Sequence, residues 1–221
     1  MCGRVNGNFH PTNFRSMFGL LLPPQWPGAY AVAPTMPYPI VRLPPGERVQ
    51  VTLARWGLVP AMYHGVLRQF KPSTFNARSE DVKQRPSFAL AYREARRCLV
   101  MVQSFYEWSG KQGQRQPYEI GRADGRPLVL GGLWETWLSE FGLMETFTLL
   151  TCSANDLIAP LHDRQPVILE RSDWRAWLDP RTPEEKITAL LRPCSADVLS
   201  ISPVNSQDTR PMHKRSIEQV A

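Results

Sequence analysis

The sequence predicts an α+β fold: a single domain over residues 1–221 with a mainly antiparallel, barrel-like β core and flanking short helices. Three observations predict it. Short apolar segments bounded by turn residues fill the middle of the chain, which is typical of antiparallel strands. Segments with apolar residues at helical spacing stand before and after them. No internal repeat or change of composition divides the chain, so its length favours one domain.

The strand signals begin at residues 49–54, where two valines and a leucine alternate with Gln50, Thr52 and Ala54, as in a half-buried strand. Four further short apolar segments predict strands at residues 98–106, 117–122, 127–134 and 145–152. Asp124 and Gly125 lie between the second and third of these and indicate a hairpin turn. The proline cluster at residues 23–45 predicts extended, loop-rich structure packed on the core.

Four helices are predicted around the strands. Residues 13–22 carry apolar side chains at helical spacing, and residues 87–97 follow Pro86 and end in basic residues. Ser172 is positioned to cap a short helix that holds two tryptophans. Residues 182–185, Thr-Pro-Glu-Glu, form a capping box with proline at the first helical position and predict a helix to about Leu191.

Arginine dominates the charge of the protein. The chain has 26 Lys and Arg against 20 Asp and Glu, a net charge of +6, and 21 of the 26 are Arg. The planar guanidinium suits bidentate contact with phosphate, so the composition favours nucleic-acid binding, although basic charge also serves solubility. No apolar run is long enough to span a membrane, and the polar first twenty residues exclude a secretory signal. We expect a cytoplasmic protein.

Cysteine spacing argues against a metal site. Cys2, Cys98, Cys152 and Cys194 form no C-x-x-C pair and lie near no histidine at zinc-finger spacing, so we expect neither metal nor cofactor. Cys98 and Cys152 lie in apolar runs and are expected to be buried thiols.

Cys2 can take part in a reaction that is closed to the other three cysteines. A small residue at position 2 permits removal of Met1, which leaves a cysteine with a free α-amine. That amine, with a pKa of about 7.7–8.0, is partly neutral at cellular pH and can attack an aldehyde. The thiol can then capture the imine and close a five-membered thiazolidine, which no internal cysteine can do. Taken alone, Cys2 could equally be an ordinary residue of a frayed terminus.

Three other residues are candidates for chemistry. Glu107 ends an apolar strand among aromatic residues, where burial would raise its pKa, or it is an edge carboxylate facing water. His162 lies between a leucine and Asp163 before an apolar strand, and is either a catalytic acid or base or a loop histidine without a role. Asn76 opens the polar segment 76–80, which predicts a loop or a binding edge.

Six segments occur in order along the chain: Met-Cys-Gly-Arg at 1–4, Tyr-Ala-Val-Ala-Pro-Thr at 30–35, Arg-Trp-Gly-Leu-Val-Pro at 55–60, Phe-Asn-Ala-Arg-Ser-Glu at 75–80, Phe-Tyr-Glu-Trp at 105–108 and Leu-His-Asp-Arg-Gln-Pro at 161–166. Together they resemble the SOS-response-associated peptidase family, also called abasic-site-processing proteins. The resemblance covers residues 2–178, and the C-terminal part is expected to complete the fold.

The resemblance implies a role for each matching residue. Cys2 would form a thiazolidine with the ring-opened deoxyribose of an abasic site in single-stranded DNA, after self-removal of Met1. Asn76 would hold the sugar or the terminus, Glu107 would assist proton transfer, and His162 would assist sugar opening and crosslink reversal, with lyase-type chemistry. Phosphate contacts are implied for Arg4, Arg78 and Arg164. The context would be the replication fork, and the protein a monomer.

Two positions depart from the family pattern. Ala31 stands where the family usually has asparagine, which removes a polar group near the site. Met62 and Tyr63 stand where tryptophans are common, and Tyr63 could stack on bases in their place. Two rival hypotheses also remain: an N-terminal-nucleophile or cysteine peptidase or amidase, and a non-covalent reader of single-stranded or modified DNA.

Overall fold

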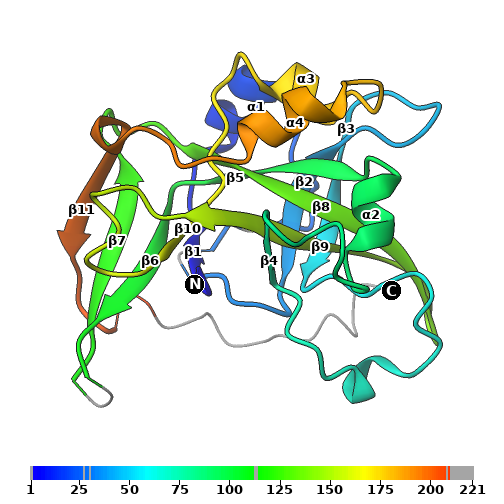
Figure 1. Ribbon diagram of the computed structural model, residues 1–221, viewed down its shortest axis with the longest axis horizontal. Helices are drawn as coiled ribbons and strands as arrows, with labels where there is room; N and C mark the ends of the chain where they lie inside the picture. Colours follow the sequence, from blue (N-terminus) through cyan, green and yellow to red (C-terminus); the bar gives the residue numbers. More distant parts are fainter. Residues whose placement is uncertain (1, 27, 30, 112–113, 208, 210–221) are drawn as a thin grey trace.

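A closed barrel of five strands forms the core of the protein (Figure 1). The computed structural model describes residues 2–26, 28–29, 31–111, 114–207 and 209. Around the barrel the strands run in the order β5 (Arg97–Val102), β2 (Pro37–Arg42), β3 (Gln50–Trp56), β9 (Gly142–Ser153) and β8 (Leu128–Ser139), and β8 pairs with β5 to close it. Every pairing is antiparallel except that of β3 with β9. The predicted α+β class with a barrel-like core is confirmed.

Two short strands extend the barrel along β9. β4 (Asn76–Arg78) runs parallel to β9, and β10 (Arg164–Pro166) runs antiparallel to it. Thr151 of β9 pairs with Arg78 on one side and with Pro166 on the other, so β4 and β10 flank the same stretch of β9. This end of β9 brings together segments that lie far apart in the sequence.

A second, four-stranded antiparallel sheet lies beside the barrel. Its order is β1 (Val5–Asn6), β6 (Ser104–Ser109), β7 (Gln116–Arg122) and β11 (Leu199–Pro203). Gln103 separates β5 from β6, and its main-chain N–H bonds to the carbonyl of Asn6. The predicted single strand at 98–106 is therefore wrong: the chain leaves the barrel at Gln103 and enters the second sheet.

The helices are short and lie outside the barrel. They are α1 (Pro11–Phe18), α2 (Ala89–Arg93), α3 (Trp174–Leu178) and α4 (Glu184–Leu190), with 3-10 turns η1 (Leu67–Gln69) and η2 (Ala196–Val198). In Figure 1, α1, α3 and α4 gather over one end of the barrel. Phe18 and Trp174 join α1 to α3, with ring centroids 4.9 Å apart. No helix in the described part of the chain is long and apolar enough to cross a membrane.

Helix boundaries differ from the prediction for local reasons. The helix predicted at 87–97 is reduced to α2, because Ala95 takes a left-handed conformation with φ 51° and Arg97 already belongs to β5. The predicted capping box does not form: Pro183 is the N-cap of α4 and no side chain caps that helix. Ser172 does not cap α3, whose N-cap is Asp173.

The observed bounds of α1, β8 and β9 also differ from the predicted ones. α1 begins earlier than predicted, at Pro11, with the His10 side chain as cap, and ends at Phe18, where the C-cap Gly19 adopts φ 70°. The strands predicted at 127–134 and 145–152 are each twelve residues long and form one hairpin. Residues 37–42 of the proline-rich segment form β2, so part of that segment is barrel wall.

Aromatic side chains fill the barrel. The rings of Trp56 and Phe147 stack with centroids 6.3 Å apart, and Tyr38 lies 6.5 Å from Phe147. The indole N–H of Trp56 donates to the carbonyl of Phe75 at 2.7 Å, and the hydroxyl of Tyr38 donates to that of Met101 at 2.8 Å. Since the buried polar atoms of these rings are satisfied, the aromatic core is rigid where it supports the N-terminus.

Candidate active site

Cys2 is buried against the barrel, with 1% of its surface exposed. The chain that follows it is fixed on both sides. Val5 pairs with Phe105 of β6 and exchanges two main-chain hydrogen bonds with Val32, and the carbonyl of Arg4 accepts the N–H of Tyr106 at 3.0 Å. The N-terminal residues are therefore held as part of the sheet and do not fray. Met1, whose removal the sequence predicts, lies outside the described residues.

Asn76 anchors Cys2 directly. Its side-chain nitrogen donates to the carbonyl oxygen of Cys2 at 2.7 Å, and the parallel pairing of β4 with β9 places Asn76 opposite Leu149. Asn76 is buried, and its Oδ1 has no partner in the part of the chain that the structure describes. A buried acceptor of this kind is costly unless it meets a donor, so Oδ1 is suited to receive an N–H or O–H of a ligand or of a free terminus.

The thiol of Cys2 is held in its neutral form. Burial raises its pKa far above the ordinary value, and the negative charge of Glu107 raises it further. The nearest recorded partner of Sγ is the carbonyl of Arg4, at 3.8 Å. At neutral pH this sulfur is therefore a thiol and not a thiolate, so any attack by it needs a base to accept its proton.

Glu107 lies on β6, opposite Tyr118 of β7, and 3% of its surface is exposed. Burial raises the pKa of its carboxyl group, and the carboxylate of Asp163 adds to the effect. A buried carboxyl whose pKa is raised holds its proton to higher pH than an exposed one, which suits a proton donor in acid–base catalysis. The alternative interpretation of Glu107 as an edge carboxylate facing water is wrong, because the residue is buried.

His162 lies just before β10. Burial lowers the pKa of its imidazole, and the positive charge of Arg164 lowers it as well, so the ring is neutral at pH 7. Its Nδ1 lies 2.9 Å from the main-chain nitrogen of Arg164 and 2.8 Å from Oδ1 of Asp163. In a neutral imidazole, a given ring nitrogen either donates or accepts a hydrogen bond, but not both. We assign Nδ1 as the acceptor from Arg164, because the side chain of Asp163 is 77% exposed and free to turn to water. The ring proton is then on Nε2.

Arg4 lies two residues after Cys2, and Arg78 lies two residues after Asn76. Nε and Nη1 of Arg4 are buried without a partner among the described residues, and burial lowers the pKa of the group. Arg78 is exposed and lies two residues beyond Asn76, on the same face of β4. Unused guanidinium donors beside Cys2 and an exposed one beside Asn76 fit an anionic ligand such as phosphate.

Arg164 has a different environment. Both of its terminal nitrogens meet the carboxylate of Glu80, at 2.6 and 2.7 Å, and one also donates to the carbonyl of Thr151 at 2.6 Å. Its side chain is 10% exposed. The phosphate contact expected for Arg164 stays a prediction, and this geometry does not favour it.

Tyr63 is held within its own loop. Its hydroxyl donates to the carbonyl of Val66 at 3.1 Å, and its ring packs on Phe70 and Trp137, with centroids 4.9 and 6.0 Å away. The neighbouring Met62 is 56% exposed. Stacking of Tyr63 on a base stays a prediction, and Met62 is the more accessible of the two. Ala31, the other departure, is fully buried.

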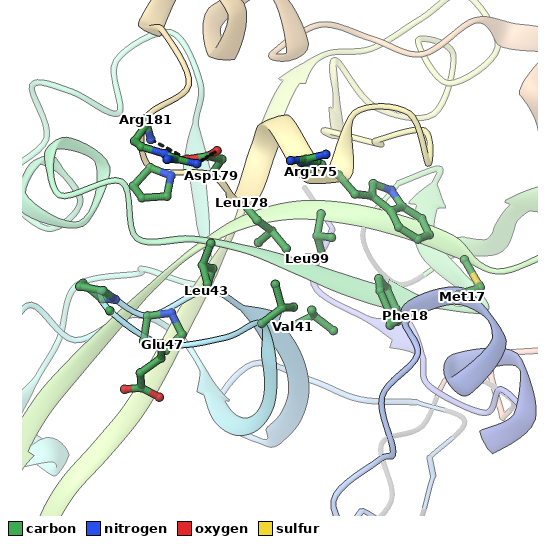
Figure 2. Close-up of a pocket in the computed structure, with 16 residues that line it drawn as sticks. Met17, Phe18, Val41, Leu43, Glu47, Leu99, Arg175, Leu178, Asp179 and Arg181 are labelled. Atoms are coloured by element: carbon green, nitrogen blue, oxygen red, sulfur yellow. Dashed lines mark hydrogen bonds and ion pairs between the residues drawn. The ribbon is translucent and has the colours of Figure 1, made fainter.

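An apolar groove lies elsewhere on the described structure. Figure 2 shows this apolar groove, about 670 Å³ in volume, between α1, the loop after β2 and the end of α3. Met17, Phe18, Val41 and Leu99 line it, and the ion pair of Asp179 with Arg181 lies at its rim. None of its lining residues is Cys2, Asn76, Glu107 or His162, so cavity size does not identify the reactive group.

Three residues near the site were missed by sequence reasoning. Asp163 modifies the pKa of both Glu107 and His162, and Glu80 binds Arg164. Burial raises the pKa of the Tyr38 hydroxyl, and Tyr38 lies close enough to Cys2 for the charge of a Cys2 thiolate to raise it further. Asp163 and Glu80 stand within the quoted motifs, but only the pairing of β4 and β10 with β9 reveals their partners.

Comparison with known families now identifies the chain. The sequence matches the family described as SOS response associated peptidase (SRAP) over residues 1–209, nearly its whole length. The protein belongs to the SRAP family. The match extends beyond the motif-bearing residues 2–178 and includes α4 and β11.

Named relatives of this SRAP chain share one description. It is similar to the abasic site processing protein YoqW of Bacillus subtilis, 30% identical over 181 residues, which cover 80% of this chain and 79% of the relative. It is also similar to the abasic site processing protein HMCES of Gallus gallus, 29% identical over 185 residues, 72% of this chain and 54% of that protein.

Solved structures support the SRAP fold. A crystal structure of a Bordetella bronchiseptica protein superposes with a TM-score of 0.82 at 27% identity, over 92% of this chain and all of the other. A Bacteroides thetaiotaomicron protein superposes with a TM-score of 0.81 at 22% identity, over 95% of this chain and 97% of the other, and shows the fold alone. The fold described above is therefore shared with these two solved structures.

Proposed function

We propose that this SRAP protein processes abasic sites in single-stranded DNA by forming a covalent thiazolidine between Cys2 and the deoxyribose. The observation that carries the proposal is the hydrogen bond from Asn76 to the Cys2 carbonyl, which fixes the N-terminal cysteine beside a buried carboxyl group. The names of the bacterial and vertebrate relatives give the substrate class.

The reaction begins with removal of Met1, which converts the main-chain nitrogen of Cys2 into a primary amine. We propose that the same site carries out this cleavage. A terminal amine with a pKa of about 7.7–8.0 is partly neutral at pH 7 and is a competent nucleophile. Oδ1 of Asn76, buried and without a partner among the described residues, is suited to orient the new N–H groups.

Sugar opening supplies the electrophile. The abasic deoxyribose is mostly a closed hemiacetal, and its C1′–O4′ bond must break to give the aldehyde. Because Nδ1 of His162 accepts the Arg164 N–H, its Nε2–H is the donor available to protonate O4′. As the aldehyde forms, the C1′ hydroxyl gives its proton to the same nitrogen, so the imidazole is neutral again after the step.

The bond-forming steps then balance with loss of one water. The amine of Cys2 adds to C1′ and gives a carbinolamine. In its protonated form, which burial favours, Glu107 donates a proton to the leaving hydroxyl, water departs, and a protonated imine forms. Glu107 is then a carboxylate and accepts the thiol proton as sulfur attacks C1′. The electron pair of the C=N bond returns to nitrogen, and the five-membered ring closes as a neutral amine.

The order of these steps accounts for two further reactions: cleavage of the DNA strand by a lyase reaction, and reversal of the crosslink. The imine can lose the 3′ phosphate by β-elimination, which cleaves the strand. Ring closure removes the imine and so protects the strand. In reversal the C1′–S bond breaks as the nitrogen lone pair re-forms the protonated imine, and sulfur takes up a proton. We propose that His162 and Glu107 determine how fast the ring reopens, because they are the acid–base groups next to it.

Single-stranded DNA is held by its backbone in this proposal. Arg4 and Arg78 contact phosphates on either side of the lesion, and binding weakens with salt. An abasic nucleotide enters the buried site more readily than an intact one because it has no base to unstack. A monomer acting on single strands exposed at replication forks fits these requirements.

A denaturing gel with an abasic single-stranded oligonucleotide tests the proposal. Wild-type protein is expected to give a heat-stable shifted band, which Cys2→Ala and Cys2→Ser do not give. A form with an uncleavable extension before Cys2 separates the rivals. If the extended form crosslinks as well as wild type, the mechanism through the Cys2 amine is excluded. If the extended form binds DNA but forms no crosslink while wild type does, non-covalent reading cannot be the protein's whole function. Turnover of peptide amides without any DNA adduct would favour the amidase hypothesis.

A further inference from the structure

A small pocket lies between α2, the start of β5 and α4. Its volume is about 380 Å³, which is within the range of pockets that hold small molecules. None of the residues assigned above to the reaction or to DNA lines it. Its charged lining residues are three cations, Lys83, Arg93 and Arg97, and one anion, Glu184. The pocket therefore has a net positive charge, which favours an anionic ligand.

Arg97 gives the pocket a fixed guanidinium group. The residue is 5% exposed, its Nε donates to the carbonyl of Trp177 at 2.5 Å, and its Nη2 donates to the carbonyl of Asp179 at 2.8 Å. Nη1 makes no hydrogen bond within the described part of the chain. Because the other two nitrogens already hold the group in place, Nη1 can bind an oxyanion with little further loss of side-chain freedom.

Tyr92 gives the pocket wall a second buried polar group. The residue is 9% exposed, and its hydroxyl is buried without a hydrogen-bond partner among the described residues. A buried hydroxyl in this state is costly, and a phenol O–H is a suitable donor to an anion. Ala95, with φ 51°, turns the chain between α2 and β5, so that Tyr92 and Arg97 line the same pocket.

Lys83 is the cation of this pocket that a ligand can recruit. Its Nζ lies 5.5 Å from the centre of the Tyr92 ring and forms an ion pair with Glu184 of α4. Both side chains of that pair are about half exposed, and ion pairs of this exposure are weak. An anion that also meets Arg97 and Tyr92 can therefore take Lys83 from Glu184.

We propose that this pocket binds the phosphate monoester group of a small molecule, held by Nη1 of Arg97, the hydroxyl of Tyr92 and Nζ of Lys83. A phosphate monoester carries about 1.5 to 2 negative charges near pH 7, which suits a lining of three cations and one anion. A phosphodiester of the DNA backbone fits less well, because it has a single charge and a sugar on each side, while Tyr92 and Arg97 are recessed. The site does not depend on the proposed function of Cys2.

Isothermal titration calorimetry of the full chain tests the site, with adenosine 5′-monophosphate and inorganic phosphate as probes. Adenosine is the uncharged match and should bind roughly tenfold or more weakly than its monophosphate. Tyr92→Phe removes only the hydroxyl and should weaken the binding of both probes roughly tenfold, as expected for the loss of a hydrogen bond to a charged group. Tyr118→Phe, on β7, is the matched control and should bind like wild type.

Glu184→Gln is expected to act in the opposite direction. The change frees Lys83 and removes the one negative charge of the lining, so the monophosphate should bind roughly threefold more tightly. Glu185→Gln removes the next charge along α4, which does not line the pocket, and should alter the affinity less. Both positions are exposed, so neither change should prevent folding.

The outcomes separate this site from the DNA site. The proposal is overturned if wild type binds neither probe, if adenosine binds as tightly as its monophosphate, or if Tyr92→Phe binds like wild type. Loss of binding in Arg78→Ala would place the ligand at the DNA site and contradict the proposal as well. A 5′-phosphorylated oligonucleotide that binds through Tyr92 more tightly than the monophosphate would assign the pocket to DNA ends and overturn the small-molecule ligand. A wild-type protein that forms no crosslink overturns the proposed function alone, because crosslinking does not involve Tyr92.

Discussion

The side-chain amide of Asn76 donates to the main-chain carbonyl of Cys2 at 2.7 Å, and so joins two residues that are 74 positions apart in the sequence. This bond makes the N-terminus a fixed part of the barrel. Its loss should release the terminal amine from the position in which Glu107 and His162 can act on it.

Asn76→Ala is expected to lower the crosslinking rate by roughly ten- to a hundredfold, because the amine loses its orientation while its chemistry is unchanged. Single-turnover crosslinking, quantified on denaturing gels, measures the effect. Asn205→Ala, at an exposed position, is the matched control and should react like wild type. Equal rates for all three proteins would show that the Asn76 bond has no part in the reaction.

Glu107→Gln keeps the shape of the side chain but removes its proton transfer. The rate should fall by about 10²–10⁴-fold, the usual range for a lost general acid. In wild type the rate should rise with pH as the amine loses its proton and fall again as Glu107 loses its own. The fall at high pH should disappear in Glu107→Gln, and its persistence there would assign that limb to another group.

The raised pKa of Glu107 also predicts a pH-dependent stability. A carboxyl whose pKa is higher in the folded than in the unfolded state stabilises the fold at pH below its unfolded value of about 4.3, and this contribution is lost as pH rises through the folded value. Glu107→Gln should therefore become more stable relative to wild type as pH rises. Urea unfolding of both proteins at a series of pH values from 4 upward measures the difference.

His162→Ala should slow sugar opening and crosslink reversal more than it weakens DNA binding. Because the pKa of His162 is lowered, the imidazole is neutral across the physiological range, and the reversal rate should show no histidine titration above pH 7. Reversal is followed by transfer of the protein from a labelled to an unlabelled abasic strand. His64→Ala, at an exposed position, is the control, and an equal loss in both variants would contradict the role.

Gly7→Ala tests the packing beneath the N-terminal strand. A Cβ at this position would lie 2.9 Å from Cε2 of Tyr38, 3.0 Å from Trp26 and 3.1 Å from the carbonyl of Ala29. Such crowding of buried atoms should lower the free energy of unfolding by about 1–3 kcal/mol. Gly121→Ala, whose nearest neighbours are 3.7 and 3.8 Å away, is the control and should not be destabilised. Chemical denaturation of both variants decides.

The fold class could be predicted from the sequence because the strands carry strong local signals. Asp124 and Gly125 indicated the turn between β7 and β8, and the apolar run at 145–152 is the buried half of β9. The break at Gln103 could not be predicted, since neither Gln103 nor Ser104 is a turn-forming glycine or proline and only the partner strand changes there. The barrel closure of β8 on β5 likewise depends on tertiary pairing.

Of the site, the sequence indicates which residues are reactive but not how they are held. The 1,2-aminothiol chemistry of Cys2 follows from its position alone. The neutral state of its thiol follows from burial beside Glu107, which has no local signature. Arg164 shows the same limit: an arginine next to a histidine in a motif suggests a phosphate ligand, and only the structure shows Glu80 bound to its fork.

Intact mass spectrometry of the protein after incubation with an abasic single-stranded oligonucleotide tests the central claim most directly. The predicted adduct has the mass of the oligonucleotide plus the protein without Met1, less one water. It should resist both borohydride reduction and thiol alkylation at Cys2, because the imine and the thiol have been consumed in the ring. An adduct that borohydride reduces while Cys2 is still alkylated, or an identical adduct from Cys2→Ala, would contradict the account.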